Sequence, residues 1–325
     1  MRKLSFIILT YNSEDDIKDC LDSLLKNFDS KEAEIIIWDN DSSDNTKKIL
    51  EDYKKFNFIK IIFNNSNIGF AEGNNKASKF ANCEYICLLN ADTISDYKVF
   101  KEILYYMENN KDIGIVGPKC VSKNGVIQES YGYFPTILRE FLGKFFMSLY
   151  LEKIPIIKKL KNKLLYQDNL KEVDWVGGAC AIIRKNVWDK IGGLDVTYFF
   201  SNGDMIDFCY KAKNLGYKVI YYPLVSIIHK GSRSVTKNLQ SRIIGLKSGY
   251  LGTLYFFSQH NKSLIYIYFV KLCFIFISLT KGIIGSLLIV FNRKFKDLAL
   301  SHFYVALFLF KNFFNNNFKK LCLQE

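Results

Sequence analysis

The chain is poor in the residues and motifs on which several familiar classes of site depend. It has only three His and four Pro in 325 residues. Its eight Cys form no Cys-x-x-Cys pair and no zinc-finger spacing, and most of them lie in apolar runs. We therefore expect reduced thiols, as in the cytosol. No Gly-x-Gly-x-x-Gly follows the first apolar run and no Gly-Lys-Ser/Thr loop occurs, which argues against a dinucleotide oxidoreductase and a P-loop protein.

Two further absences bear on location. No signal peptide is readable, because residues 1–3 lead directly into an apolar run without a small-residue cleavage site, so we expect a cytoplasmic protein. Acidic residues are nearly missing from the C-terminal part. From Lys211 on, 17 Lys and Arg accompany only Asp297 and Glu325, whereas the first 210 residues carry 28 basic and 30 acidic residues. Because long apolar stretches separate the C-terminal basic residues, the surplus favours lipid over nucleic acid as a partner.

Apolar runs alternate with helical patterns through the first 90 residues. The runs at 4–10, 34–38, 58–63 and 85–89 suit strands that are buried on both faces. Helical spacing of apolar residues fills the intervals between them. This alternation predicts an α/β fold with a parallel sheet and right-handed crossovers.

Polar residues follow these runs at the points where the strands are expected to end. They are Thr10, Tyr11 and Asn12, then Asp39 and Asn40, then Gly69 and Asn74 within the stretch 67–75, and finally Asn90, Ala91 and Asp92. In α/β sheets the ligand lies beyond the carboxyl ends of the strands, so one crevice is expected to collect them. Asp92 would there present a carboxylate to a metal bound to a diphosphate, although Asn and Asp also end strands simply as turn formers.

In order and spacing these segments resemble the inverting family 2 glycosyltransferases, particularly the rhamnosyltransferase-like branch of bacterial surface polysaccharide synthesis. The likeness extends from about Leu4 to Ser234. It includes Trp38-Asp39-Asn40, Asn67-Ile68-Gly69-Phe70-Ala71, Leu89-Asn90-Ala91-Asp92, Gly192-Gly193-Leu194-Asp195 and Asp207-Phe208-Cys209. It implies a GT-A fold, a Rossmann-like and mostly parallel sheet flanked by helices, over residues 1–240. Residues 241–325 would form a helical appendage that associates with a membrane.

The resemblance also implies a nucleoside-diphosphate sugar as donor, with Mg²⁺ or Mn²⁺ to offset the charge of the departing diphosphate. Asp92 is the expected metal ligand, and Asn90 stands where related enzymes carry an acidic residue. Asp39 would contact the nucleobase of the donor. The donor-binding residues implied are Thr10, Tyr11, Asn12, Asp39, Asn40, Gly69, Asn74, Asn90 and Ala91. Capping of strand ends is the structural alternative for several of them.

An inverting transferase needs a carboxylate that takes the proton of the acceptor hydroxyl. The segment Gly203-Asp204-Met205-Ile206-Asp207 allows two alignments with the family. From the Asp207 side, Met205 occupies the position usually assigned as the base, whereas an insertion counted from the upstream glycines places Asp204 there. We expect Asp204 to be the base, and Asp207 to anchor the helix or contact the acceptor side. If neither carboxylate acts, the chain is catalytically impaired.

Two further segments complete the expected site. Trp175 with Gly177 and Gly178 resembles the acceptor-side segment of the family, where an indole stacks on a sugar ring. A Trp packed in the core is the alternative. His229 ends an apolar run, and a basic loop begins at Lys230 that we expect to be flexible and to close over the diphosphate. Related enzymes often carry a His at this position, and Lys230 and Arg233 lie beside it, so we assign His229 to the metal or the phosphate. A lone structural His is the alternative.

Beyond residue 240, charges interrupt the apolar stretches, so no charge-free stretch reaches the roughly 20 residues of a simple membrane-spanning helix. On a helix, one sector would hold Lys271, Ser278, Lys281, Gly282, Gly285, Asn292 and Arg293. We expect this helix to lie in the membrane interface with snorkelling lysines, followed by a second helix over about 298–314. A homodimer interface or a covered core helix is the alternative. The segment Phe141 to Tyr166 is a second candidate for contact with lipid or acceptor.

These patterns together predict an inverting glycosyltransferase that is peripheral to the inner face of the cell membrane. It would move rhamnose or another hexose from a nucleoside-diphosphate donor to a hydroxyl of a lipid-linked or growing glycan. The alternatives are a nucleotide-sugar-binding protein without turnover and a membrane scaffold.

Overall fold

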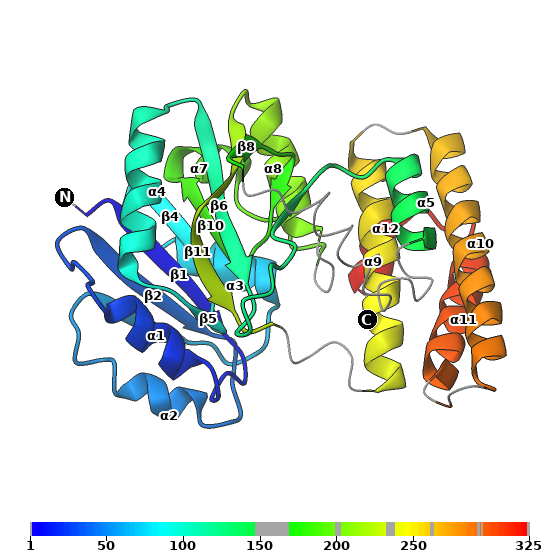
Figure 1. Cartoon of the computed structure of the whole chain (residues 1–325), viewed down its shortest axis with the longest axis horizontal. Coiled ribbons are helices and arrows are strands. Elements are labelled where there is room, and N and C mark those ends of the chain that lie inside the picture. The colour runs from blue at the N-terminus through cyan, green and yellow to red at the C-terminus, as the bar shows by residue number, and fades with distance from the viewer. Residues whose placement is uncertain are drawn as a thin grey trace. The chain divides into compact units, whose positions relative to one another are not determined.

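The computed structural model describes residues 2–146, 169–198, 203–231, 238–260, 263–290, 293 and 295–323. Most of the segment Phe141 to Tyr166, and Arg233 of the expected basic loop, lie outside these residues. The chain forms two compact units (Figure 1). The first comprises Met1–Phe134, Tyr166–Val196 and Asp204–Gly231, and the second comprises Pro135–Leu165, Thr197–Gly203 and Ser232–Glu325. The division of function at residue 240 stays a prediction.

The first unit is built on a mixed sheet of nine strands in the part of the chain that the structure describes. They are β1 (Leu4–Thr10), β2 (Ala33–Asp39), β3 (Ile59–Phe63), β4 (Tyr85–Asn90), β5 (Thr93–Ile94), β6 (Ile113–Val121), β8 (Lys171–Glu172), β10 (Cys180–Arg184) and β11 (Lys218–His229). Their order is β3-β2-β1-β4-β10-β6-β11-β5, with β8 paired to β11. β1 to β4 pair in parallel, β10 runs against both neighbours, and β6 and β11 are again parallel. A separate two-stranded sheet joins β7 (Tyr131–Gly132) and β9 (Trp175–Val176).

Helices cover both faces of the large sheet. They are α1 (Ile17–Leu25), α2 (Thr46–Glu51), α3 (Phe70–Ser78), α4 (Tyr97–Asn109), α7 (Lys185–Ile191) and α8 (Asp204–Asn214). Alternate residues of β1 point to opposite faces of the sheet. Phe6 packs in a cluster with apolar residues of α1 and α4. Ile7 packs in a cluster with apolar residues of α3, α7 and α8. Burial on both faces explains why the strands read as continuous apolar runs. The predicted α/β order is confirmed.

The second unit consists of helices in the part that the structure describes. They are α5 (Ile137–Phe146), α9 (Leu239–Gln259), α10 (Leu264–Leu288), α11 (Phe295–Lys311) and α12 (Phe318–Leu323). α11 packs on both α9 and α10. Among the described residues, α10 is the one helix that is long and apolar enough to cross a membrane. The predicted second apolar helix corresponds to α11.

The polar sector expected on α10 exists, but it faces inward. Lys271 and Lys281 are only 2% and 6% exposed, and Ser278 is fully buried. Phe269 and Ile283, on the apolar side, are 52% and 55% exposed. The expectation that the lysines snorkel toward water is therefore wrong. Helical periodicity shows which residues share a face, but it does not show which way that face points.

Candidate active site

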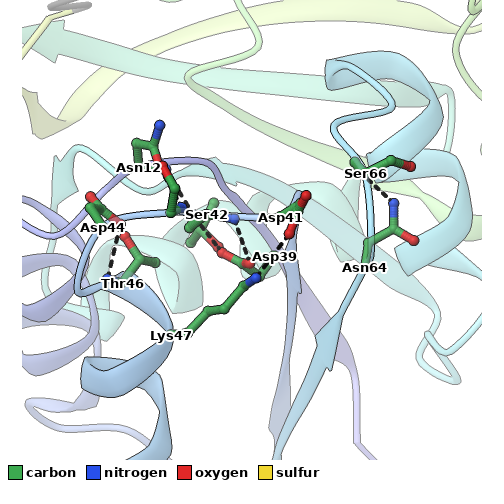
Figure 2. Close-up of polar contacts among 11 residues, drawn as sticks. Asn12, Asp39, Asp41, Ser42, Asp44, Thr46, Lys47, Asn64 and Ser66 are labelled. Carbon is green, nitrogen blue, oxygen red and sulfur yellow. Dashed lines mark hydrogen bonds and ion pairs between the residues drawn. The ribbon is translucent and has the colours of Figure 1, made fainter.

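A buried carboxylate joins the carboxyl ends of β1 and β2 to the loop that follows β2 (Figure 2). Thr10 and Asp39 end the two strands and are paired opposite each other. The Thr10 hydroxyl donates to Asp39 Oδ1 at 2.8 Å, and the Ser42 amide donates to Oδ2 at 2.9 Å. Asp39 is 0% exposed, so its carboxylate holds the loop through buried hydrogen bonds. Its contact with a nucleotide base stays a prediction.

Asn12 connects the loops after β1 and β2. Its φ of 49° lies in the left-handed region, which Asn adopts more readily than most residues. Its side-chain oxygen accepts from the backbone N–H of Ser43 at 2.8 Å, and the backbone N–H of Asn12 donates to Ser42 Oγ at 2.9 Å. The neighbouring Tyr11 is 51% exposed. The two loops therefore form a braced rim on which the Tyr11 ring is open to a ligand.

Asn40 holds the loop that precedes α3. Its Nδ2 donates to Asn67 Oδ1 at 3.2 Å and to the Gly69 carbonyl at 3.1 Å. Gly69 has a φ of 81°, which a residue without a Cβ adopts at little cost. Asn74 is buried and donates to the Phe70 carbonyl at 2.8 Å, so it braces α3 internally. The loop is thus held from two sides before any ligand binds.

Asp92 and His229 meet although they are far apart in the sequence. β4 ends at Asn90, and Asp92 lies immediately before β5. Antiparallel pairing of β5 with the end of β11 places His229 opposite Thr93. As a result His229 Nε2 lies 3.3 Å from Asp92 Oδ1, and the two side chains are only 18% and 19% exposed. The Lys230 amide also donates to the Asp92 carbonyl at 2.9 Å.

Gln128 fixes the imidazole ring of His229. Its Oε1 lies 2.8 Å from His229 Nδ1, and its Nε2 donates to the His229 carbonyl at 2.9 Å. If Nδ1 donates to the amide oxygen, the Nε2 lone pair points toward Asp92. Such a nitrogen beside a carboxylate oxygen suits a divalent metal. Among the described residues no group of three His, Cys, Asp or Glu could hold a metal, so diphosphate oxygens and water would have to complete the coordination.

The ammonium group of Lys230 is engaged by carboxylates at the start of α1. Its Nζ lies 2.9 Å from Asp16 Oδ1 and 2.6 Å from Asp19 Oδ2, and the side chain is 6% exposed. Burial opposes the charge, but hydrogen bonds to Asp19 and Asp16 raise the pKa of Lys230. The structure therefore differs from the expectation of a flexible loop here, because this cation is already paired and pins the end of β11.

Trp175 lies in the two-stranded sheet and is half-buried. Its indole lies against Gly132, where an added Cβ would come within 2.4 Å of the ring. The Gly177 amide donates to the Ser130 carbonyl at 2.8 Å, which continues the pairing of this segment. Gly178 follows, facing the side chains of α3 and α8. Trp175 is thus neither a fully buried core residue nor a free surface residue, and its acceptor-side role stays a prediction.

Asp204 begins α8, and the next side chain enters the apolar interior. Met205 is 3% exposed and belongs to the cluster that contains Phe208, so it is occupied by packing. Asp204 is 7% exposed and its Oδ1 accepts from the Met205 amide at 2.7 Å. Burial raises the pKa of Asp204 to about 7, a value suited to proton exchange at neutral pH. Asp207 is buried and lies 2.6 Å from Lys211 Nζ, so it anchors α8 through an ion pair.

Comparison with known proteins identifies the family. Residues 5–192, more than half of the chain, match the domain described as glycosyl transferase family 2. The chain belongs to this family. The resemblance in the sequence motifs is confirmed at this level, and the rhamnosyltransferase-like branch stays a prediction.

Two relatives illustrate how far the similarity of this family 2 glycosyltransferase extends. It is 28% identical over 231 residues to the low-salt glycan biosynthesis hexosyltransferase of Haloferax volcanii, which covers 70% of this chain and 66% of that protein. It is 32% identical over 126 residues to a poly-beta-1,6-N-acetyl-D-glucosamine synthase of Staphylococcus epidermidis, which covers 38% and 30%. The matches therefore span less than two thirds of either relative.

A solved structure supports the fold. The mannosyltransferase of Pyrobaculum calidifontis, in complex with GDP-Man and Mn²⁺, aligns with a TM-score of 0.59 over 98% of this chain and 88% of that one, at 13% identity. Similarity at this identity shows the fold alone. The GT-A fold is confirmed, and membership of glycosyl transferase family 2 rests on the domain match.

The predicted site residues differ in how well the sequence defined their positions. Those after β1, β2 and β4 lie at strand ends as expected, with the Asn90 amide bound to the Ala179 carbonyl and Ala91 buried beside it. His229 reaches Asp92 directly. Sequence reasoning missed Gln128, because its role depends on the fold of a loop that carries no local signal.

Proposed function

We propose that this family 2 glycosyltransferase is a metal-dependent, inverting hexosyltransferase. Its donor would be a nucleoside-diphosphate sugar that carries rhamnose or another hexose, and its acceptor would be a hydroxyl of a lipid-linked or growing glycan. The observation that carries the proposal is the meeting of the Asp92 carboxylate and the His229 imidazole at the carboxyl edge of the sheet. The raised pKa of Asp204 adds a group suited to general-base catalysis.

Related structures and the loop geometry both support the donor class. The mannosyltransferase neighbour holds GDP-Man, and a Staphylococcus aureus TarS structure holds UDP-GlcNAc. In this chain the exposed Tyr11 ring would lie against the nucleoside. Gly73 lies on the inner side of α3, where a Cβ would come within 2.5 Å of Leu9, so the helix packs directly on β1. That packing keeps the Asn40-bound loop close to the strand ends, where the diphosphate would lie.

Asp92 Oδ1 and His229 Nε2 would hold Mg²⁺ or Mn²⁺. When bound, the ion offsets negative charge that develops on the departing diphosphate. Mn²⁺ is present in the mannosyltransferase neighbour. The Lys230 amide holds the Asp92 backbone, and Gln128 holds the His229 ring, so both ligands are oriented in advance. Asn90 is neutral, so the site has one negative charge fewer than a pair of carboxylates would provide, and we expect modest metal affinity.

Asp204 would act as the base that activates the acceptor. Its carboxylate takes the hydroxyl proton while the hydroxyl oxygen forms a bond to the anomeric carbon. The bond from that carbon to the diphosphate breaks on the opposite face, which inverts the configuration and leaves the electron pair on the diphosphate. Burial that raises the pKa of Asp204 also raises its proton affinity, as this step requires. Trp175 would stack on the acceptor sugar, with Gly177 and Gly178 leaving room for the ring.

We place the catalytic part, residues 1–240, on the cytoplasmic side of the cell membrane, with the helices from 241 onward at its inner face. The apolar outer side of α10 supports this location. One observation favours a second candidate function: Met205, at the position where one alignment expects the base, is buried in the core. If Asp204 does not replace it, the chain binds nucleotide sugar without turnover, or serves as a membrane scaffold.

A donor panel tests the proposal. Hydrolysis and transfer would be measured with UDP-, dTDP- and GDP-sugars, with Mn²⁺ or Mg²⁺, on membranes that supply lipid acceptors. Metal-dependent turnover that is lost in Asp204→Asn supports the transferase. Donor binding without wild-type turnover, with a genuine acceptor present, supports the second candidate. If no donor binds with either metal, both fail.

A further inference from the structure

α10 and α11 carry large apolar side chains on the outside. Among the described residues, those exposed on these two helices include Ile265, Phe269, Phe276, Ile283, Leu287 and Phe310. Ile265 and Phe310 are 82% and 69% exposed. The charged residues of α10, Lys271 and Lys281, are both buried, so no charge interrupts the outer face of this helix. Water disfavours an uninterrupted apolar surface of this kind.

The buried ammonium group of Lys271 has protein partners for its hydrogen bonds. Lys271 Nζ lies 3.3, 2.6 and 2.9 Å from the carbonyl oxygens of Asn312, Phe313 and Asn315, and it donates to Asn316 Oδ1 at 2.9 Å. These acceptors belong to the segment just after α11, where helix carbonyls lack intrahelical partners. A lysine that binds backbone carbonyls inside a bundle is the arrangement typical of charged residues within membranes.

Small residues bring α10 and α11 close together. A Cβ on Gly282 would lie 2.8 Å from the Phe303 ring, and a Cβ on Gly285 would lie 3.1 Å from Ala299 Cβ. Gly285 follows Gly282 on α10, whereas its partner Ala299 precedes Phe303 on α11. The two helices are therefore antiparallel and form a hairpin, and they lie side by side in Figure 1. Association through Gly and Ala is characteristic of helices in lipid, where apolar side chains gain nothing by leaving the solvent.

We propose that α10 and α11 form a hairpin that inserts into the hydrocarbon of a lipid bilayer, with its polar face turned inward and its apolar face against the acyl chains. The 25 residues of α10 extend for about 37 Å at 1.5 Å per residue. The hydrocarbon layer of a bilayer is about 30 Å thick, so α10 is long enough to cross it. Insertion goes beyond the location at the inner face proposed above, because the hairpin would enter the hydrocarbon from that face, and it is independent of the chemistry at Asp204.

The distribution of charge favours a bilayer over a second copy of the chain. Arg293 and Lys296 are exposed at the turn of the hairpin, next to the exposed Asp297, and Lys311 is exposed at the other end of α11. Basic residues at both ends of an apolar surface match the phosphate groups at the two surfaces of a bilayer. An interface with a second copy would instead carry polar residues around the rim of its apolar patch. On α10 both lysines and Ser278 lie inside, and the hydroxyl of the exposed Ser286 donates to the Gly282 carbonyl of its own helix.

Depth-dependent fluorescence quenching tests insertion in the full chain. The three native Trp all lie before residue 189, so a Trp added to the hairpin gives a separate signal over a constant background. Ile283→Trp would be reconstituted in vesicles of phosphatidylglycerol and phosphatidylethanolamine whose acyl chains carry bromine. Leu215→Trp is the matched control, because Leu215 is 48% exposed in the first unit, close to the 55% of Ile283. We expect loss of the added emission at 283 and none at 215.

Extraction tests whether the protein is only peripherally bound, and a mass measurement tests whether a second copy of the chain covers the apolar face. Wild-type protein should stay with the membrane in alkaline carbonate, which releases peripheral proteins. Equal quenching at 283 and 215, or release by carbonate, would overturn insertion. A water-soluble dimer obtained without detergent would also overturn it, because the apolar face would then be covered by a second copy. Each of these results leaves turnover to be measured separately, so failure of insertion is distinguishable from failure of the proposed transferase.

Discussion

The two units of this glycosyltransferase distribute polar and apolar side chains in opposite ways. In the first unit, residues such as Phe6 and Ile7 fill both sides of the sheet, and polar residues gather at strand ends. In the second unit, Lys271 and Ser278 lie inside, and Ile283 lies outside. Each arrangement is favourable only in its own surroundings, water for the first and hydrocarbon for the second. The comparison shows that the exposure of a side chain has to be judged against the solvent that surrounds it. It predicts the effects of four sets of substitutions.

The largest effect is expected where the first unit gathers its polar groups. Asp92→Ala removes the carboxylate from the point where it meets His229. Because a metal ion supplies several kcal/mol of charge stabilisation, we expect turnover to fall by a factor of ~10³ or more and metal-dependent donor binding to be lost. Mn²⁺ titration and transfer assays measure both. Asp112→Ala is the control, since Asp112 pairs at the surface with Lys218. Full activity of Asp92→Ala would defeat the assignment.

Asp204→Asn should lower turnover by ~10²–10⁴ while making the fold more stable. The unfolded carboxyl loses its proton near its ordinary pKa of 3.8, whereas burial raises the pKa of Asp204 in the fold to about 7. Stability therefore falls as pH rises between these values and stays low above them. Asn is always neutral, so the variant should have the higher Tm at pH 8, with the gap closing below pH 4. Wild-type turnover should rise with pH through about 7.

Asp207→Asn is the matched control for Asp204→Asn. Asp207 pairs with Lys211, so its neutral variant loses an ion pair and should have a lower Tm. A lower Tm for Asp204→Asn as well, or an unchanged rate, would show that Asp204 is a structural carboxylate like its neighbour. Thermal melts at pH 4 and pH 8 separate the two cases.

Charges on the outer face of the hairpin test the second unit. Ile283→Lys and Leu287→Lys place ammonium groups where we expect acyl chains. The cost of a lysine at the centre of a membrane helix is roughly 2.5–3.5 kcal/mol, so each should weaken membrane partitioning by a factor of ~10². Sedimentation of membranes measures the distribution. Leu215→Lys, on an exposed site of the first unit, should leave it unchanged. Equal partitioning of all three would contradict a lipid-facing surface.

The smallest effect is expected at a residue that acts through another. Gln128→Ala frees the His229 ring, and loss of such a partner typically weakens metal affinity by about 10–100-fold. Mn²⁺ binding in the absence of donor, followed by electron paramagnetic resonance, reports affinity directly. Gln128→Glu keeps an oxygen that can face Nδ1 and should retain more affinity than the alanine variant. If the two variants bind Mn²⁺ as the wild type does, Gln128 is only a loop residue.

Local signals were sufficient to predict the strand ends that frame the site. At Thr10, Asp39 and Asn90 a continuous apolar run stops and polar residues begin, and the structure ends β1, β2 and β4 at these residues. The pattern is local because a strand buried on both faces must be apolar along its whole length. The same reasoning gave the fold class.

Features that depend on distant pairing could not be predicted in this way. The sequence assigns His229 to the metal or the phosphate, but it does not predict the contact with Asp92, because the register of β5 on β11 that produces it is not visible in either segment alone. The inward direction of Lys271 depends on the carbonyls that follow α11. Periodicity defined the sector correctly, but the neighbour that a sector faces is decided by other parts of the chain.

The place of β10 in the sheet has a consequence for synthesis of the protein. β10 lies between β4 and β6, although it follows both in the sequence, and β11 supplies His229 later still. A growing chain therefore exposes an open edge on β4 until residue 184 has been made. The catalytic unit becomes complete only once residue 229 has emerged, shortly before the apolar hairpin is translated. Because domains fold as units from the N-terminus during synthesis, the site can be assembled before the most aggregation-prone segment appears.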